Sequence, residues 1–317
     1  ALYRKNLDFT AVGSEVNTTE LADARETVWQ IKNPTKIYGF TLGLGYKREP
    51  LKLKGIPEVI SIGAEEGFTT GNMVKNVAID IAKSMAFYQW FFKFEFPNRP
   101  MYATSIHSDH GQAFEDFIHL SSYTYQAEHK GASELFRAHE VAHQMWGHMV
   151  GWKSDRDQWL SESFAEYSAL MFIEIALKEK KLFYEALSVY TEMVTGSIKS
   201  FLSNFSRPIL TMYTTLNKKD RNKVGPVGIG ARASTSDVPM AYVLQNYHKG
   251  PLVIHMLRMR MRNATGSDKA FRELMSDYLK SYSGKNPSTD DFRKMVEKHT
   301  RSNWKWFFNQ WIHDNDI

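Results

Sequence analysis

The stretch that decides the fold reads Arg-Ala-His-Glu-Val-Ala-His-Gln-Met-Trp and spans residues 137–146. Its two histidines are four residues apart, and residues four apart lie on the same face of an α-helix. His139 and His143 can therefore direct two imidazole nitrogens at one metal ion. Glu140 lies about 100° around the helix from His139, beside that point rather than on it. Such a pattern is typical of a zinc ion with an activated water and a glutamate base. The alternative is a solvated helix with two unrelated histidines.

The residues around this motif predict a helix at 133–147, with Ser133 as its N-cap and Gly147 at its end. Leu135, Ala142 and Trp146 share the face of the two histidines.

Length and composition indicate a soluble globular protein. The chain has 317 residues, more than the usual single domain of about 100–150, so we expect two or three structural units. Hydrophobic residues make up 43% and charged residues 24%, which are ordinary values. The aromatic content of 14% predicts packed aromatic layers. No run of about 18 apolar residues occurs, so we expect no transmembrane segment.

Net charge and cysteine content limit which binding partner the chain can have and which side chains could bind a metal. The net charge is +5, but the basic residues are spread among 35 acidic ones, which argues against a nucleic-acid partner. The chain contains no cysteine, so a zinc ion would have to be bound by histidine and carboxylate side chains.

Residues 1–62 have the character of β-structure. Alternating apolar and polar residues predict strands at 27–32 and 37–44, and a further strand is expected at 58–63. These strands are too few for a stable sheet of their own. We therefore interpret the region as the tail of an N-terminal β-domain.

A helix and two strands are predicted between this region and the two-histidine motif. Apolar residues at spacings of three and four predict a helix at 70–92 with a buried stripe. The stripe comprises Val74, Val77, Ala78, Ile81, Met85 and Tyr88. Short strands at 101–106 and 117–121 then flank a loop at 107–116.

The chain after the motif is predicted to be helical. The expected helices span residues 158–180, 182–203, 238–262, 267–283, 289–299 and 303–313. Ser288 and Asp291 resemble a capping box with aspartate in the place of the usual glutamate or glutamine. A glycine-rich segment at 225–236 is too long to be a simple connection. A small sheet followed by helices indicates the α+β class.

A catalytic zinc usually has three protein ligands, and the third should be an acid on a nearby element. The predicted helix at 158–180 carries Glu162 and Glu166 on one stripe. An antiparallel arrangement of the two helices could bring either carboxylate to the histidines, so spacing alone leaves both as candidates.

The motif, together with Trp-Leu-Ser-Glu-Ser-Phe-Ala-Glu-Tyr at 159–167, resembles the gluzincin zinc aminopeptidases of the aminopeptidase N and leukotriene hydrolase family. The resemblance implies one Zn²⁺ bound by His139, His143 and Glu162. It also implies a thermolysin-like zinc peptidase domain followed by a mostly helical half. On this basis we expect three regions: residues 1–62 as the end of a β-domain, 63–180 as the zinc-binding subdomain and 181–317 as the helical subdomain. This chain has serines on both sides of Glu162, where the family usually has Asn-Glu-Gly.

Two further stretches carry the resemblance with different strength. Tyr-His-Lys-Gly at 247–250 matches a family stretch in which the tyrosine hydroxyl stabilises the tetrahedral intermediate, which implies that role for Tyr247. The family's Gly-x-Met-Glu-Asn strand binds the free amine of the substrate. Its counterpart here is Gln-Ala-Phe-Glu-Asp at 112–116, where Glu115 takes the place of the family's glutamate. An alternative registration on residues 117–120 leaves that glutamate without a counterpart.

The sequence thus predicts a zinc metallopeptidase acting on peptide substrates. The resemblance favours an aminopeptidase in which Glu140 is the base and Tyr247 stabilises the oxyanion. The alternatives are a zinc endopeptidase and a non-catalytic peptide-binding scaffold of the same fold. Glu166 is a candidate for orienting a zinc-binding histidine through its second ring nitrogen. No oligomeric state or cellular compartment is predicted.

Overall fold

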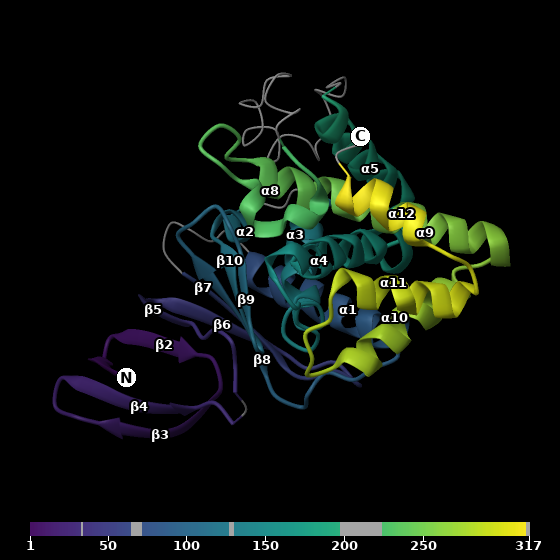
Figure 1. Ribbon diagram of the computed structural model, residues 1–317. Coiled ribbons are helices and arrows are strands. Elements are labelled where there is room, and N and C mark those ends of the chain that lie inside the picture. Colours follow the sequence, from purple (N-terminus) through teal and green to yellow (C-terminus); the bar gives the residue numbers. More distant parts are fainter. Residues whose placement is uncertain (33, 65–71, 127–129, 197–223, 315–317) are drawn as a thin grey trace. The chain divides into compact units, whose positions relative to one another are not determined.

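The computed structural model describes residues 1–32, 34–64, 72–126, 130–196 and 224–314 (Figure 1). The chain is a mixed structure in which most strands precede the helices, as predicted. It divides into two compact units, which are described separately. The first consists of Ala1–Phe87, Glu95–Glu128 and Phe136–Gln144, and the second of Tyr88–Phe94, His129–Leu135 and Met145–Ile317.

The strands lie in the first unit and form three sheets. They are β1 Leu2–Arg4, β2 Leu7–Ala11, β3 Ser14–Glu20, β4 Ala24–Gln30, β5 Phe40–Leu44, β6 Tyr46–Leu51, β7 Val59–Ala64, β8 Met101–Ile106, β9 Gln112–Phe114 and β10 Phe117–Ser121. The sheet orders are β1-β4-β3, β2-β5 and β6-β7-β8-β10-β9. All five predicted strands are present, and β9 lies inside the segment that we predicted as a loop.

The five-stranded sheet combines parallel and antiparallel pairs. β8 pairs in parallel with both β7 and β10, while the outer strands β6 and β9 are antiparallel to their neighbours. A parallel pair requires a crossover connection. The segment between β7 and β8 contains the helix α1, Met73–Phe92. The six residues of its predicted apolar stripe are each at most 1% exposed. The predicted stripe is therefore confirmed.

The helix α3, Ala132–Ala142, carries the two-histidine motif and is shorter than predicted. Ser133 is not its N-cap, because it lies inside the helix. The helix follows Gly131, whose N–H donates to the Glu134 carboxylate. Its end comes early because the chain turns back: Gly147 has a φ of +133°, and its N–H donates to the carbonyl of Val150.

A buried arginine anchors α3 within the first unit. The Arg137 guanidinium is fully buried, forms an ion pair with Asp80 of α1 and donates to both the hydroxyl and the carbonyl of Thr124. Thr124 belongs to the short helix α2, Tyr123–Gln126. A buried charge is tolerated when it is paired and its hydrogen bonds are made. These contacts therefore fix the orientation of the motif helix.

The second unit is helical. Its α-helices are α4 Trp159–Met171, α5 Lys180–Thr195, α8 Ala241–Val243, α9 Gly250–Thr265, α10 Lys269–Tyr282, α11 Thr289–Thr300 and α12 Lys305–Phe308. The π-helices are η2 Phe172–Ala176, η4 Leu244–Lys249 and η5 Asn309–His313, and the 3₁₀-helices are η1 Asp155–Asp157 and η3 Val227–Ala233. Within the described part of the chain, every helix is too short or too polar to span a lipid bilayer.

The predicted helices differ from these mainly at π-helical segments. The helix expected at 158–180 ends at Ala176 after a π-helical turn, and that expected at 238–262 is divided into α8, η4 and α9. The helix predicted at 182–203 is present as α5 up to Thr195, and residues 197–203 of the predicted span lie outside the described residues.

An aromatic cluster forms part of the core of the second unit. Trp146, Trp159, Phe164, Tyr278 and Phe292 make ring contacts with centroids 4.9–6.3 Å apart. Each is at most 1% exposed. This cluster agrees with the packed aromatic layers expected from composition. Trp159 and Phe164 of α4 belong to it, so the cluster holds this helix in the core of the second unit.

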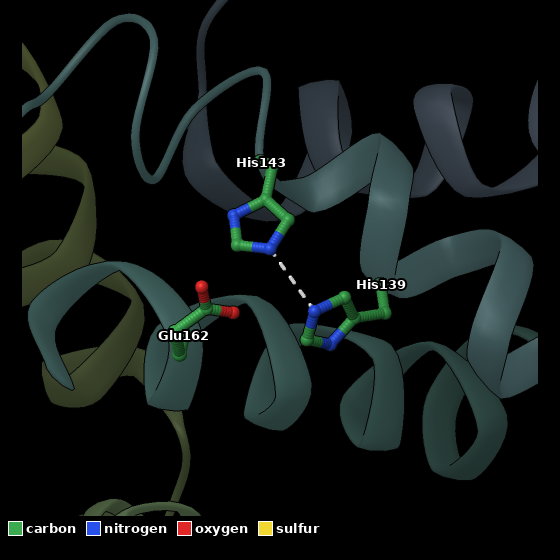
Figure 2. Close-up of side chains that lie close together, drawn as sticks. All are labelled: His139, His143 and Glu162. Atoms are coloured by element: carbon green, nitrogen blue, oxygen red, sulfur yellow. Dashed lines mark hydrogen bonds between the residues drawn. The ribbon is translucent and has the colours of Figure 1, made fainter. Parts of the chain in front are cut away.

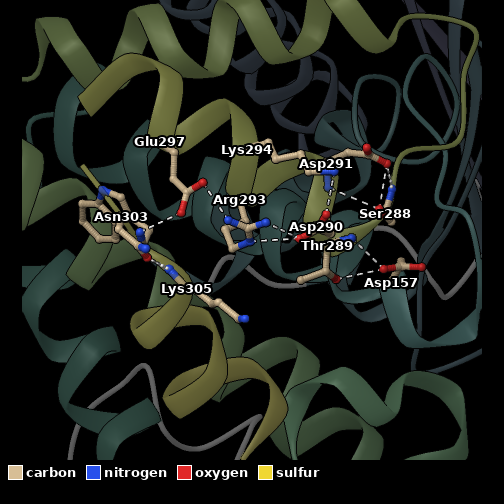
Figure 3. A network of polar contacts seen from close by, with 11 residues as sticks. Asp157, Ser288, Thr289, Asp290, Asp291, Arg293, Lys294, Glu297, Asn303 and Lys305 are labelled. Atoms are coloured by element: carbon tan, nitrogen blue, oxygen red, sulfur yellow. Dashed lines mark hydrogen bonds and ion pairs between the residues drawn. The ribbon is translucent and has the colours of Figure 1, made fainter. Parts of the chain in front are cut away.

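The start of α11 has the predicted capping box. The Ser288 hydroxyl accepts from the N–H of Asp291, and the Asp291 carboxylate accepts from the N–H of Ser288 (Figure 3). Asp157 of η1 also binds this helix end, since its carboxylate accepts from the N–H and the hydroxyl of Thr289. The same hydroxyl accepts from the indole of Trp159. The chain just before Glu162 is thus tied to α11.

Candidate metal centre

The two motif histidines lie one turn apart at the end of α3. The N–H of His143 donates to the carbonyl of His139, which continues the helical pattern just past the helix. Their Nε2 atoms are 3.0 Å apart and their ring centroids 4.7 Å apart. His139 is buried and His143 is half-buried. The predicted convergence of two imidazole nitrogens is therefore present.

Glu162 lies in the first turn of α4 and belongs to the same group. One carboxylate oxygen of Glu162 and one ring nitrogen each of His139 and His143 all lie within 4.8 Å of one another. Figure 2 shows the carboxylate and the two rings turned toward one another. Zinc ligands lie 2.0–2.2 Å from the metal, so two ligands of a tetrahedral site are about 3.3 Å apart. The donor set and its spacing fit one zinc ion.

Glu166, which spacing could not distinguish from Glu162, has a different environment. Its buried carboxylate accepts a hydrogen bond from the hydroxyl of Tyr190 on α5. The ring of Tyr190 packs against His248, and burial lowers the pKa of His248 to about 4, partly opposed by the Glu166 charge. The orienting role that we suggested for Glu166 stays a prediction.

The predicted base Glu140 is buried in the first unit beside a glycine of the loop at 107–116. A Cβ atom added to Gly111 would lie 2.3 Å from Oε1 of Glu140 and 2.9 Å from the Phe136 ring. Only a residue without a side chain fits here without displacing the carboxylate. Our sequence interpretation missed Gly111, although its place just before the predicted amine-binding segment was a usable signal.

The predicted amine anchor Glu115 lies between β9 and β10. Its carboxylate forms an ion pair with Arg99 at 2.6 Å, and Arg99 also pairs with Asp116 at 2.5 Å. Burial raises the pKa of Asp116 to about 6, with the Arg99 charge opposing this shift and the Glu115 charge adding to it. A substrate amine at Glu115 would share that carboxylate with Arg99.

A glutamine fixes this segment to the end of the motif helix. The Gln144 side-chain amide donates to the carbonyl of Phe114 at 2.8 Å, and its oxygen accepts from the N–H of Asp116 at 2.9 Å. Gln144 is buried and directly follows His143. The strand β9 is therefore held to the residue beside one histidine of the metal group.

The alternative registration, on residues 117–120, falls on β10. His119 there has its Nε2 atom 3.1 Å from the Thr41 hydroxyl and its ring against those of Phe114 and Phe117. Burial lowers its pKa. These contacts are those of a packed structural histidine.

Tyr247 lies in the π-helix η4, and a second tyrosine accompanies it. The hydroxyl of Tyr242 donates to Oε1 of Glu162 at 3.3 Å, and the Tyr242 ring packs edge-on against that of Tyr247 with centroids 6.1 Å apart. Burial raises the pKa of Tyr242, and the Glu162 carboxylate adds to the shift, so the phenol keeps its proton. The sequence interpretation missed Tyr242.

The serines on both sides of Glu162 fix α4 to two other segments. The Ser161 hydroxyl donates to the carbonyl of Trp146, and the Ser163 hydroxyl donates to the carbonyl of Asn246 in η4, both at 2.7 Å. A Cβ atom on Gly250 would lie 1.9 Å from the Ser163 hydroxyl oxygen. The departure from the family pattern at these positions is thus accommodated by hydrogen bonds and a glycine.

Comparison with known proteins identifies a family. The family described as "Peptidase family M1 domain" matches residues 81–311. Endoplasmic reticulum aminopeptidase 2 of Bos taurus is 27% identical over 154 residues, which cover 49% of this chain and 13% of that protein. Probable aminopeptidase 2 of Sulfurisphaera tokodaii is 23% identical over 318 residues, covering 97% of this chain and 37% of that protein.

Solved structures have the same fold. The M1 zinc metallopeptidase of Deinococcus radiodurans superposes with a TM-score of 0.68 at 16% sequence identity, covering 100% of this chain and 63% of that chain. A two-domain M1 zinc metallopeptidase bound to L-tryptophan gives a TM-score of 0.69, also at 16% identity and with the same coverage. The chain spans less than two thirds of the length of these relatives.

Proposed function

This chain belongs to peptidase family M1, and we propose that it is the catalytic part of a zinc aminopeptidase. The observation that carries the proposal is the group of His139, His143 and Glu162, with Glu140 as the next residue after the first histidine. The aminopeptidase names of the relatives support the substrate class, which is a peptide with a free amino terminus.

The proposal also covers the division of the chain into subdomains. We assign residues 63–180 to a thermolysin-like zinc-binding subdomain, 181–317 to a helical subdomain and 1–62 to the end of an N-terminal β-domain. The parallel core of the five-stranded sheet, followed by α3 and α4, supports the first assignment.

Each site residue has a distinct chemical role in the proposed reaction. Zinc bound by the three ligands would polarise the scissile carbonyl and lower the pKa of water. The Glu140 carboxylate accepts a proton from the attacking water and delivers it to the leaving amine. The Tyr247 phenol donates a hydrogen bond to the developing oxyanion. Glu115 binds the ammonium group of the substrate, in competition with its ion pair to Arg99.

The test combines metal analysis with reporter hydrolysis by the whole chain. We expect about one zinc per chain and cleavage of aminoacyl 4-nitroanilides. Glu140→Gln should lower kcat by at least about 100-fold, because general base catalysis contributes about 10²–10⁴-fold. Zinc content should stay unchanged, since Glu140 is not a ligand. Activity unchanged in Glu140→Gln, or a chain that binds no zinc, would refute the proposal.

Acetylated reporters separate the two peptidase alternatives. An aminopeptidase loses activity when the substrate amine is blocked, whereas an endopeptidase cleaves both forms equally. Equal cleavage of both reporters would remove Glu115 from its assigned role. Zinc binding without turnover of either reporter would indicate a peptide-binding scaffold.

A further inference from the structure

Two tyrosines five residues apart face the same region because the backbone between them is π-helical. Residues five apart in an α-helix are rotated by about 140° from one another, since each residue adds about 100°. The wider turn of η4, Leu244–Lys249, reduces this difference. The rings of Tyr242 and Tyr247 can therefore meet, with their centroids 6.1 Å apart.

The phenol of Tyr242 has a hydrogen bond to the metal group. The Tyr242 hydroxyl donates to Oε1 of Glu162 at 3.3 Å, from a half-buried position. A glutamate side chain has several rotatable bonds, and fixing it in one rotamer costs up to about 2 kcal/mol. A donor that holds one oxygen restricts the rotamer before metal binds and directs the second oxygen.

The backbone that carries Tyr242 is itself fixed to the helix that carries Glu162. The Ser163 hydroxyl donates to the carbonyl of Asn246, and the Asn246 side-chain amide donates to the carbonyl of Tyr242. Asn246 is fully buried, so these bonds are protected from water. The phenol and the carboxylate are therefore held in register by three hydrogen bonds.

We propose that Tyr242 is a positioning residue of the metal centre, which holds the Glu162 carboxylate ready for zinc through its hydroxyl. The inference rests on the proposed function, because it presupposes that Glu162 is a zinc ligand. Groups that orient metal ligands typically change metal affinity by about 10–100-fold when they are removed. Tyr242 acts through Glu162, whereas Tyr247 would act on the substrate.

The test measures zinc affinity separately from turnover. Zinc is removed from wild type, Tyr242→Phe and Tyr247→Phe, and the dissociation constant of each is determined by competition with a chelating dye. Tyr247→Phe is the matched control, because it removes one phenol oxygen from the neighbouring tyrosine, whose ring packs against that of Tyr242. Thermal unfolding of the zinc-free proteins reports whether either substitution disturbs the fold.

We expect the zinc dissociation constant of Tyr242→Phe to rise by about 10–100-fold, with unfolding of the zinc-free protein unchanged. Excess zinc should then restore most of its kcat. Tyr247→Phe should keep the wild-type affinity and a low kcat at any zinc concentration. Equal zinc affinity in Tyr242→Phe and wild type, or a lowered melting temperature of the zinc-free variant, would overturn the inference. Wild type that binds no zinc would instead refute the proposed function.

Discussion

Replacing Arg137 with methionine tests whether the buried ion pair of α3 stabilises the fold. Arg137 is fully buried. Its guanidinium pairs with Asp80 and donates to the hydroxyl and the carbonyl of Thr124 at 2.9 and 2.6 Å. Methionine fills a similar volume but leaves the Asp80 carboxylate buried without this cation. Breaking a buried pair on one side costs about 3–5 kcal/mol. We therefore expect the free energy of unfolding to fall by that amount.

The assay is urea denaturation of the zinc-free protein, followed by circular dichroism at a fixed pH. Arg293→Met on α11 is the control, because Arg293 pairs with Asp290 and Glu297 near the surface (Figure 3). Such pairs are worth about 0.2–1 kcal/mol, so the control should lose little stability. A loss below about 1 kcal/mol in Arg137→Met, equal to that of the control, would refute the reasoning.

The double variant Arg137→Met/Asp80→Asn separates the two contributions to this loss. If the cost of Arg137→Met comes from an uncompensated carboxylate, removing the carboxylate should recover part of the stability. If the cost comes from packing alone, the two single effects should add.

Three further substitutions test local features of the site. Gly111→Ala should push Oε1 of Glu140 from its place and lower kcat by about 100-fold at unchanged zinc content, which steady-state kinetics and metal analysis would measure. Gly250→Ala should cost about 1–3 kcal/mol in urea denaturation through its clash with the Ser163 hydroxyl, and adding Ser163→Gly should recover part of this loss. Burial raises the pKa of Asp116 from 3.8 to about 6, so the folded state retains a proton that the unfolded state has lost between these values. The stability of wild type relative to Asp116→Asn should therefore fall as pH rises from about 4 to 6, by roughly 3 kcal/mol at most, and a flat difference would contradict the shift.

The sequence predicted elements whose pattern is local and regular. The apolar stripe of α1 repeats at helical spacing over about four turns, and every member is buried. The spacing of His139 and His143 needs only one helical turn to bring two nitrogens together, and they lie 3.0 Å apart. Strands such as β8 and β10 were recognisable because they are short apolar runs between turns.

Features that depend on contacts between segments distant in the sequence could not be predicted from local patterns. Glu162 and Glu166 share a helical stripe, and the hydroxyl of Tyr190 on α5 is one of the contacts that distinguish them. Tyr242 was missed because α-helical spacing separates it from Tyr247, while the π-helix η4 brings their rings together. The strand β9 has three residues, too few for an alternating pattern.

The tie between the start of α4 and the start of α11 has a consequence for the order in which the protein matures. Asp157 and Trp159 find their partner Thr289 only after 130 or more further residues have been added to the growing chain. Contacts at such separation form late, because a long loop must close first. A nascent chain that has already emerged with both histidines therefore still lacks the anchor for the helix of Glu162. Acquisition of zinc by all three ligands should accordingly follow, and not precede, synthesis of the C-terminal helices.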